Sequence, residues 1–360
     1  MSTSTIVTTE HTELLQKVVK EIVNDPSTYL GAKYLPSVAL PVRKVRVEVW
    51  EATGGLTKEH VVGTDPTYIQ SGGFRTQEFE PPAYKEKIIV DEKEILYLRE
   101  VGMNDRSQRG VKQYIDRRVD QLNRRLEARI EKLRWDVLLT SKFSYQGVDV
   151  DFGIPAGNRA TPSIAWSTDN INANNSADPV KDLRYWIHGG LAAFRKYKIT
   201  GMICNPNTAR WIMDNTAVQS LVKTYFSAEN FGAYEPQKTL QMLIPQCPPL
   251  TVYNGWYQSE SVASGKLTVG NAIYMIPDGY ILFEVALPGG DQYGEFVQGL
   301  NLASGSVDAP GAGKFLIVED NSVQGSKGGP GNPYIDIIAG VYGGPKLDRP
   351  FDVLTAFVGT

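Results

Sequence analysis

The chain has 360 residues, of which 42% are hydrophobic and 21% are charged, and its formal net charge is −3. This balance is typical of a folded globular protein. Because the net charge is slightly negative, it gives no overall attraction to nucleic acid or to an anionic membrane, and such a contact would need a local basic patch.

The two cysteines, Cys204 and Cys247, are far apart and lie outside any CxxC pattern. The sequence therefore encodes neither a disulfide framework nor a sulfur-ligated metal site. No stretch approaches the roughly 20 consecutive apolar residues that span a bilayer, and the N-terminus lacks a basic start followed by an apolar run. We expect two buried free thiols, no membrane contact and folding in a reducing cytoplasm.

An amphipathic helix is expected near the N-terminus, where apolar residues recur at helical spacing over 14–23 before Asp25–Pro26. From Pro41 the apolar period changes to two, which predicts a half-exposed strand. The apolar positions of this strand are Val45, Val47 and Val49.

Two more alternating runs, 74–79 and 84–90, lie on either side of Pro81–Pro82. Most of their outward positions are charged. A two-stranded ribbon with so little apolar surface is marginally stable in water by itself. We therefore expect this ribbon to lie on another surface.

One unusually long amphipathic helix is predicted over 104–140, because apolar residues step by three or four from Val111 to Val137. Its other face is rich in arginine, partly offset by acidic residues. The basic residues singled out on this face are Arg117, Arg118, Arg124 and Arg125. A solvated face with internal ion pairs is the favoured interpretation, and a surface that faces nucleic acid is the alternative.

The remaining chain alternates between helices and short strands. A hairpin is expected over 143–150, helices over 178–196, 207–214 and 218–226, and strands over 199–204, 250–253, 272–276, 280–285 and 315–319. Two final strands are expected over 334–342 and 351–358, separated by a turn over 343–350. Together these elements predict one interwoven α+β architecture with a projecting arm.

Motifs for catalysis or metal binding are weak. Pro-Gly-Ala-Gly-Lys at 310–314 resembles part of a phosphate-binding loop, but Asp308 and Phe315 occupy the positions that require glycine and a hydroxyl residue. Asp149 and Asp151 share one strand face, yet no further acidic ligand lies nearby, so a solvated face is expected. The histidines lack metal-binding spacing, and no GxSxG motif occurs. We expect no catalytic, cofactor-binding or metal-binding residues, and no enzyme.

Several turns and strand edges follow one another in a characteristic order. They are Ser71-Gly72-Gly73, Glu78-Phe79-Glu80-Pro81 with the run 85–98, the long helix, 142–151 with Gly147, Trp166-Ser167 before Asp178-Pro179, Asn205-Pro206, Val252-Tyr253 with Gly255 and Tyr257, and the two C-terminal strands. In this order, from about Tyr34 to the end, the chain resembles the major capsid proteins of tailed bacteriophages, in particular the branch of the lambda major head protein, the capsid protein E family.

The resemblance implies a Hong Kong 97-type α+β fold with an N-terminal arm, an extended β-hairpin loop, a long spine helix, and peripheral and axial domains. On this sequence it places the arm at 1–41, the extended loop at 42–98, the peripheral domain at 99–177 with the spine helix at 104–140, and the axial domain at 178–331. The C-terminal strands, 332–360, are expected to return to the peripheral domain.

The resemblance also implies a function: self-assembly as hexamers and pentamers into an icosahedral virion shell around double-stranded DNA, in the host bacterial cytoplasm. Expected partners are further copies of the chain, a portal protein, a scaffolding protein, a candidate decoration protein, and DNA on the inner face, with no membrane. The expected intersubunit loop residues are Gly72, Gly73, Phe74, Arg75, Glu78, Phe79, Pro81 and Pro82.

Two alternatives remain open from the sequence. An encapsulin-type bacterial compartment shares the implied fold but holds cargo enzymes. A carbohydrate-acting enzyme or surface-binding module is compatible with the tyrosine, tryptophan and glycine content. It would require a cleft with convergent carboxylates, which the sequence does not reveal.

Overall fold

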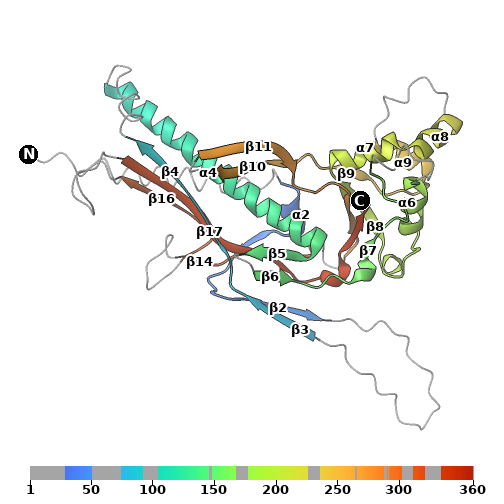
Figure 1. Ribbon diagram of the computed structural model, residues 1–360. Coiled ribbons are helices and arrows are strands. Elements are labelled where there is room, and N and C mark those ends of the chain that lie inside the picture. The colour runs from blue at the N-terminus through green and yellow to red at the C-terminus, as the bar shows by residue number, and fades with distance from the viewer. Residues whose placement is uncertain are drawn as a thin grey trace, which may run out of the picture.

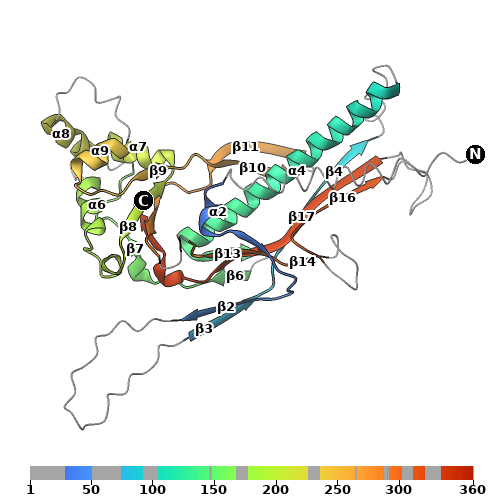
Figure 2. The same cartoon turned by 180° about the vertical axis from the view of Figure 1, so that it is seen from behind.

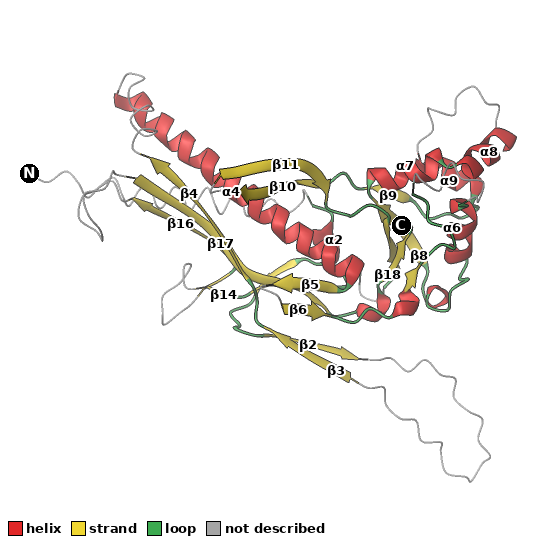
Figure 3. Ribbon diagram, viewed as in Figure 1, coloured by secondary structure: helices red, strands yellow, loops and turns green. Residues whose placement is uncertain are grey.

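The computed structural model describes residues 29–50, 74–91, 104–145, 148–167, 177–225, 236–263, 266–287, 290, 292–301, 311–320 and 334–359. A long helix runs from a β-rich wing to a body that carries most of the shorter helices (Figures 1 and 3). The expected helix over 14–23 and the glycines Gly72 and Gly73 lie outside the described residues.

The long helix α4 spans Asn104–Thr140, 37 residues, as predicted. Its apolar stripe is buried from the middle of the helix to its C-terminal end. The buried members of the stripe are Val119, Leu122, Leu126, Ile130, Leu133 and Val137. A short helix, α2 (Gly31–Tyr34), packs against α4 near the start of the described chain.

The first sheet is built around the 14-residue strand β17, which forms antiparallel pairs on both sides. Its strands are β17 (Tyr334–Leu347), β4 (Ala83–Asp91), β16 (Lys314–Asp320), β13 (Gly294–Gln298) and β1 (Ser37–Ala39). The β17 residues 335–341 lie between β4 and β16, and the last five residues, 343–347, pair with β13, which β1 joins in parallel. Helix α4 packs on one face of this sheet.

The runs 74–79 and 84–90 do not pair with each other as the expected ribbon, because each has a different partner. Strand β2 (Val45–Trp50) pairs with β3 (Phe74–Phe79) to form the projecting ribbon. Strand β4 leaves the ribbon and becomes an edge strand of the first sheet. The change of partner occurs at Pro81–Pro82, where the Pro82 carbonyl accepts a hydrogen bond of 2.9 Å from Gly343 and starts the pairing with β17.

The second sheet carries the shorter helices. Its strands, in spatial order, are β7 (Arg159–Ala160), β18 (Leu354–Phe357), β12 (Tyr280–Val285), β8 (Ile199–Cys204) and β9 (Leu250–Val252). The helices are α6 (Pro179–Ile187), α7 (Pro206–Asp214), α8 (Thr216–Tyr225) and α9 (Pro236–Leu243). The side chain of Asn205, directly after β8, accepts a hydrogen bond from the Thr208 amide at 2.7 Å. Asn205 is therefore the N-cap of α7.

The prediction of one helix over 178–196 is wrong. Helix α6 ends at Ile187, and a separate 3-10 turn, η2, covers Phe194–Lys196. Gly189 has a φ of 75°, and the Gly190 amide donates to the Tyr185 carbonyl at 2.7 Å. This is the left-handed glycine cap that terminates many helices.

The two C-terminal strands lie in different sheets. Strand β17 continues through most of the turn expected over 343–350 and ends at Leu347. After the 3-10 turn η4 (Pro350–Asp352), β18 pairs with β12 in the second sheet. The two strands expected over 334–342 and 351–358 are therefore both formed, each in its own sheet.

Three further pairs complete the strands of the described residues. The expected hairpin is β5 (Lys142–Tyr145) with β6 (Val148–Asp151), and η1 (Ala156–Asn158) follows it. The pair β14 (Leu300–Asn301) with β15 (Gly311–Ala312) precedes β16. The hairpin β10 (Trp256–Ala263) with β11 (Lys266–Tyr274) lies beside α4 in both views (Figures 1 and 2). Much of this last hairpin was not expected from the sequence.

The core has two parts. A large cluster joins the C-terminal half of α4 to the second sheet, and a smaller one joins Val119 and Leu122 of α4 to Val90 and Ile337 of the first sheet. Both cysteines are free and buried, as expected. Burial raises the pKa of the Cys204 thiol to about 12 and that of Cys247 to about 11.

Candidate assembly surface

The β2–β3 ribbon has an apolar root that anchors it to the body. Val45, Val47 and Phe79 are buried, and Val45 lies opposite Phe79 in the register. The Phe79 ring packs edge-on against Phe143 of β5 at 5.4 Å between centroids. Of the expected loop residues, Phe79 is therefore an anchor, and its burial fixes the direction in which the ribbon leaves the body.

The exposed part of the ribbon presents charged side chains. Arg75 and Glu78 of β3 are exposed, and Glu80 pairs with Arg43 at 3.0 Å. Pro81 is half-buried and Pro82 is buried; they lie in the link between β3 and β4. The structure describes Phe74 as part of β3 but not its side chain. In both views the ribbon lies below the β5–β6 hairpin and extends away from the wing, on the side of the body (Figures 1 and 2).

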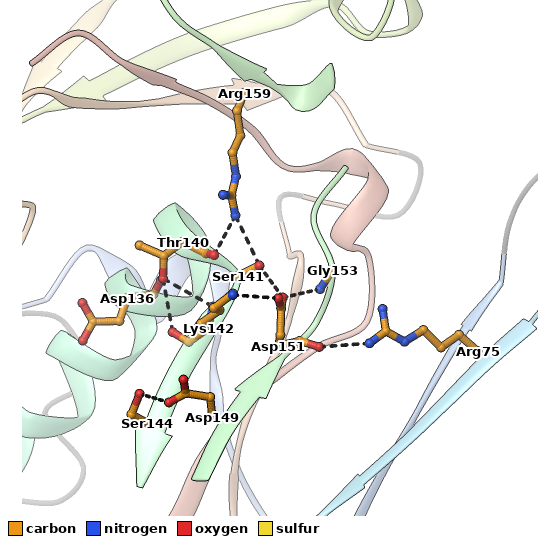
Figure 4. A network of polar contacts seen from close by, with 10 residues as sticks. All are labelled: Arg75, Asp136, Thr140, Ser141, Lys142, Ser144, Asp149, Asp151, Gly153 and Arg159. Atoms are coloured by element: carbon orange, nitrogen blue, oxygen red, sulfur yellow. Dashed lines mark hydrogen bonds and ion pairs between the residues drawn. The ribbon is translucent and has the colours of Figure 1, made fainter. Parts of the chain in front are cut away.

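A polar junction fixes the hairpin that supports this root (Figure 4). The Asp151 carboxylate accepts from the Ser141 hydroxyl at 2.6 Å and the Gly153 amide at 2.8 Å, and pairs with Lys142 at 3.2 Å. Burial by itself would raise the pKa of Asp151, but these hydrogen bonds outweigh it and the pKa is lowered. Asp149 bonds Ser144 instead. The two aspartates thus hold the hairpin.

The same junction contacts the ribbon and closes the long helix. Arg159 donates a hydrogen bond to the Thr140 carbonyl at 2.6 Å, so a cationic side chain supplies the donor that this carbonyl lacks at the C-terminus of α4. Arg75 approaches the Asp151 carbonyl at 3.4 Å. Gly153 has a φ of 73°, and a Cβ there would lie 2.6 Å from the Arg75 guanidinium. Ribbon, hairpin and helix end therefore meet at one point (Figure 4).

An open groove of about 1310 Å³ lies beside the ribbon root. Its walls come from β3, the β5–β6 hairpin and the face of the first sheet opposite α4. Apolar lining residues are Phe79, Phe143, Val150, Leu300, Phe315, Ile317 and Ile338, and charged lining residues are Arg43, Glu78, Glu80, Lys85 and Asp149. An apolar floor with a charged rim is typical of a protein contact surface.

The four arginines singled out on α4 differ in their contacts. Arg117 is exposed, and Arg124 pairs with Asp120 one turn earlier at 2.8 Å. Arg118 donates to the Tyr114 hydroxyl at 3.1 Å and lies over its ring. These local contacts favour the internal-pairing interpretation over a continuous basic surface.

Arg125 joins three elements. Its guanidinium donates to Glu86 of β4 at 2.5 Å and to Glu260 of β10 at 2.6 Å. The hydrogen bonds from Arg125 lower the pKa of Glu260, and the two carboxylates raise the pKa of Arg125. Arg125 thus ties the β10–β11 hairpin and the first sheet to α4.

A buried carboxylate that sequence reasoning missed anchors the N-terminal segment. Glu131 is fully buried in α4 and accepts from the Gly31 amide and the Trp135 indole, each at 2.8 Å, and from the Tyr253 hydroxyl at 3.0 Å. Burial, then the Glu131 charge, raise the pKa of Tyr253. Gly31 and Glu131 are 100 positions apart, so no local pattern in the sequence links them.

The described residues contain no group of three or more histidine, cysteine, aspartate or glutamate side chains placed to hold a metal ion. Within the same residues, no helix has the length and apolar content needed to cross a membrane.

Replacing Gly31 by alanine should loosen the N-terminal segment. The new Cβ would lie 2.8 Å from the Glu131 carboxylate and displace the acceptor of the Gly31 amide. We expect Gly31→Ala to lower the free energy of unfolding by about 1 to 3 kcal/mol, as for other disrupted buried hydrogen bonds. Gly157→Ala is the matched control, because a Cβ there meets nothing within 4 Å. Urea unfolding of the unassembled chain measures both, and equal stabilities would contradict the anchor.

Acid should release the β10–β11 hairpin from α4. Because the folded pKa of Glu260 is lowered, its pairing with Arg125 stabilises the fold above the unfolded pKa and is lost as pH falls through the folded value. We expect hydrogen-exchange protection of residues 256–263, corrected for intrinsic rates, to be constant from about pH 7 to 5 and to fall below about pH 4.

Glu260→Gln is the control for this pH dependence. It should show reduced protection at every pH and little further loss in acid. Protection that falls equally in both proteins would assign the acid effect to another group.

Comparisons with known proteins agree with this architecture. The sequence model of the phage major capsid protein E family matches residues 12–296. A putative capsid protein of a prophage from E. coli CFT073 shares the fold, with a TM-score of 0.54, 13% identity, and coverage of 96% of this chain and 98% of that chain. The expected Hong Kong 97-type capsid fold is thereby confirmed.

Two further structures are more distant. The capsid of cyanophage P-SCSP1u has a TM-score of 0.44 at 12% identity and covers 90% of this chain and 85% of its own. An encapsulin complex from Synechococcus elongatus PCC 7942 has a TM-score of 0.39 at 11% identity, with coverage of 93% and 89%. Neither score supports a structural argument, whereas the family match favours a phage capsid over an encapsulin. Because that match extends over more than half of the sequence, this chain belongs to the phage major capsid protein E family.

Proposed function

We propose that this chain builds the head of a tailed phage by assembling as hexamers and pentamers into an icosahedral shell around double-stranded DNA. The observation that carries the proposal is the β2–β3 ribbon, which is fixed at an apolar root and projects from the body beside an open apolar groove. A ribbon of this kind gains stability by lying on another copy of the chain.

The two sheets correspond to two roles in such a shell. We assign the peripheral domain to the first sheet with α4, and the axial domain to the second sheet with α6 to α9, near a local symmetry axis. Each ribbon would reach the next copy around that axis. A head-to-tail contact repeated about a rotation axis closes a ring, and rings joined at their edges close a shell.

Only some arginines of α4 are proposed to interact with packaged DNA. Arg117 and Arg124 are exposed, and Arg124 pairs only within α4, with Asp120, among the contacts described, whereas Arg125 ties separate elements together. In this proposal Arg117 and Arg124 moderate repulsion from packaged phosphates on the inner face. The proposal also includes a portal protein, a scaffolding protein and a candidate decoration protein, with assembly in the host bacterial cytoplasm.

Expression of the full chain tests the assembly. We expect closed shells, or hexamer and pentamer rings, by size-exclusion chromatography and negative-stain electron microscopy, either from the chain alone or after the cognate scaffolding and portal proteins are added. A folded chain that remains monomeric with both proteins present would overturn the proposal.

Charge reversal separates DNA contacts from contacts between copies. The double variant Arg117→Glu and Arg124→Glu should form shells of normal size that hold less DNA, because both side chains are exposed and neither ties separate elements together among the contacts described. The DNA-to-protein absorbance ratio of purified particles measures this. Loss of shells with a folded chain would instead assign the two arginines to contacts between copies.

A further inference from the structure

Helix α6 presents a largely basic face to solvent. One side of the helix is buried, and the opposite side is exposed at positions that recur at helical spacing. The exposed residues of this side are Lys181, Arg184, Tyr185 and His188. Both views place α6 in the body, at the end far from the wing (Figures 1 and 2). This face is therefore separate from the N-terminal half of α4, which carries Arg117 and Arg124.

The segment that follows α6 extends this face. Arg195 and Lys196 of η2 are exposed, and so is Lys198. The Arg195 side chain donates a hydrogen bond to the Gly189 carbonyl at 2.5 Å, so η2 is held at the C-terminal end of α6. Tyr197 is half-buried, and its hydroxyl bonds η4. Because the backbone is extended at Tyr197, the lysines on either side of it point the other way, toward solvent.

The cations of this surface are not neutralised by ion pairs. The α6 basic face comprises Lys181, Arg184, Arg195, Lys196 and Lys198. Within the described part of the chain, none of the five forms an ion pair with a carboxylate. The two acidic residues of the segment have other partners: Asp178 accepts from the Lys181 amide at 3.0 Å, and Asp182 accepts from the Trp166 indole at 2.9 Å. Burial raises the pKa of Asp182 more than its hydrogen bond and the Lys181 charge lower it.

The stability of α6 does not account for all of these cations. Lys181 lies in the first turn of the helix, where the helix dipole disfavours a positive charge. Arg184 donates to the Leu243 carbonyl at 3.1 Å, as Arg195 does to the Gly189 carbonyl. A carbonyl fixes the direction of a guanidinium without neutralising its charge, and the remaining N–H groups can still donate. Cations that are already held in place lose less side-chain entropy when they bind an anion.

We propose that the α6 basic face binds the phosphate backbone of double-stranded DNA. Charge complementarity identifies the partner, because DNA carries one phosphate charge about every 1.7 Å and this face carries cations without carboxylate partners. The exposed Tyr185 hydroxyl adds a hydrogen-bond donor on the same face. Phosphate contacts carry no sequence information, which suits DNA that is packaged whatever its sequence. The inference rests on the proposed shell function, which supplies the DNA, and adds a contact that α4 does not make.

DNA binding by the full chain, kept below the concentration at which shells form, tests this surface. Each phosphate contact changes the slope of log association constant against log salt concentration by about −0.9. Fluorescence anisotropy of a labelled mixed-sequence duplex between about 50 and 200 mM salt measures this slope. We expect the double variant Lys181→Gln and Lys196→Gln to make the slope shallower by about 2. Lys44→Gln with Lys85→Gln, exposed lysines near the ribbon root, is the control of equal charge and should leave the slope unchanged.

Three results would overturn the DNA contact. The first is a wild-type chain that does not bind the duplex at about 50 mM salt, and the second is an equal change of slope in both double variants. The third is a variant of Lys181 and Lys196 that binds DNA normally but no longer forms rings or shells, which would assign the face to an acidic protein surface. Failure of the wild-type chain to form particles, with lysine-dependent DNA binding intact, would instead reject the shell function and support the DNA contact.

Discussion

The packing of one long helix against two sheets is the constraint on which the rest of the structure depends. The 37 residues of α4 extend about 55 Å at 1.5 Å per residue. The middle of its apolar stripe covers the first sheet, and the C-terminal end joins the core shared with the second sheet. Because the same rigid element belongs to both cores, the wing and the body cannot separate without exposing apolar surface.

Polar contacts fix the projecting parts to this helix. Glu131 holds the N-terminal segment, Arg125 holds the β10–β11 hairpin, and Arg159 closes the helix end beside the ribbon root. Buried or paired charges are expensive to leave unpartnered, so each contact specifies one position for the segment that it holds. A shell protein needs this property, because contacts between copies repeat without error only if each arm leaves the body in a fixed direction.

The sequence predicted the elements whose side chains follow a clear period. The apolar stripe of α4 gave the bounds of the helix, and alternating valines identified β2. Errors arose where a local signal was ambiguous. A glycine pair ended α6 earlier than its apolar pattern suggested, and the polar β10 lacks the apolar alternation of a strand. Strand partners could not be predicted, because the pairing of β4 with β17 depends on contacts across more than 200 positions.

In the candidate assembly surface, too, local patterns were predictable from the sequence and long-range contacts were not. Its loop residues were predicted from motif order and resemblance, whereas the burial of Phe79 and the contacts of Arg125 with two other elements depend on distant partners. The basic pattern on α4 could not distinguish an arginine that contacts solvent from one that holds two strands. That distinction requires the three-dimensional positions of Glu86 and Glu260.

A cryo-electron microscopy reconstruction of the assembled particle tests the central claim most directly. The account predicts that the β2–β3 ribbon of each copy leaves its own body in the direction fixed by Phe79 and lies on a neighbouring copy. A particle in which the ribbons fold back on their own chains, with neighbours joined elsewhere, would contradict it.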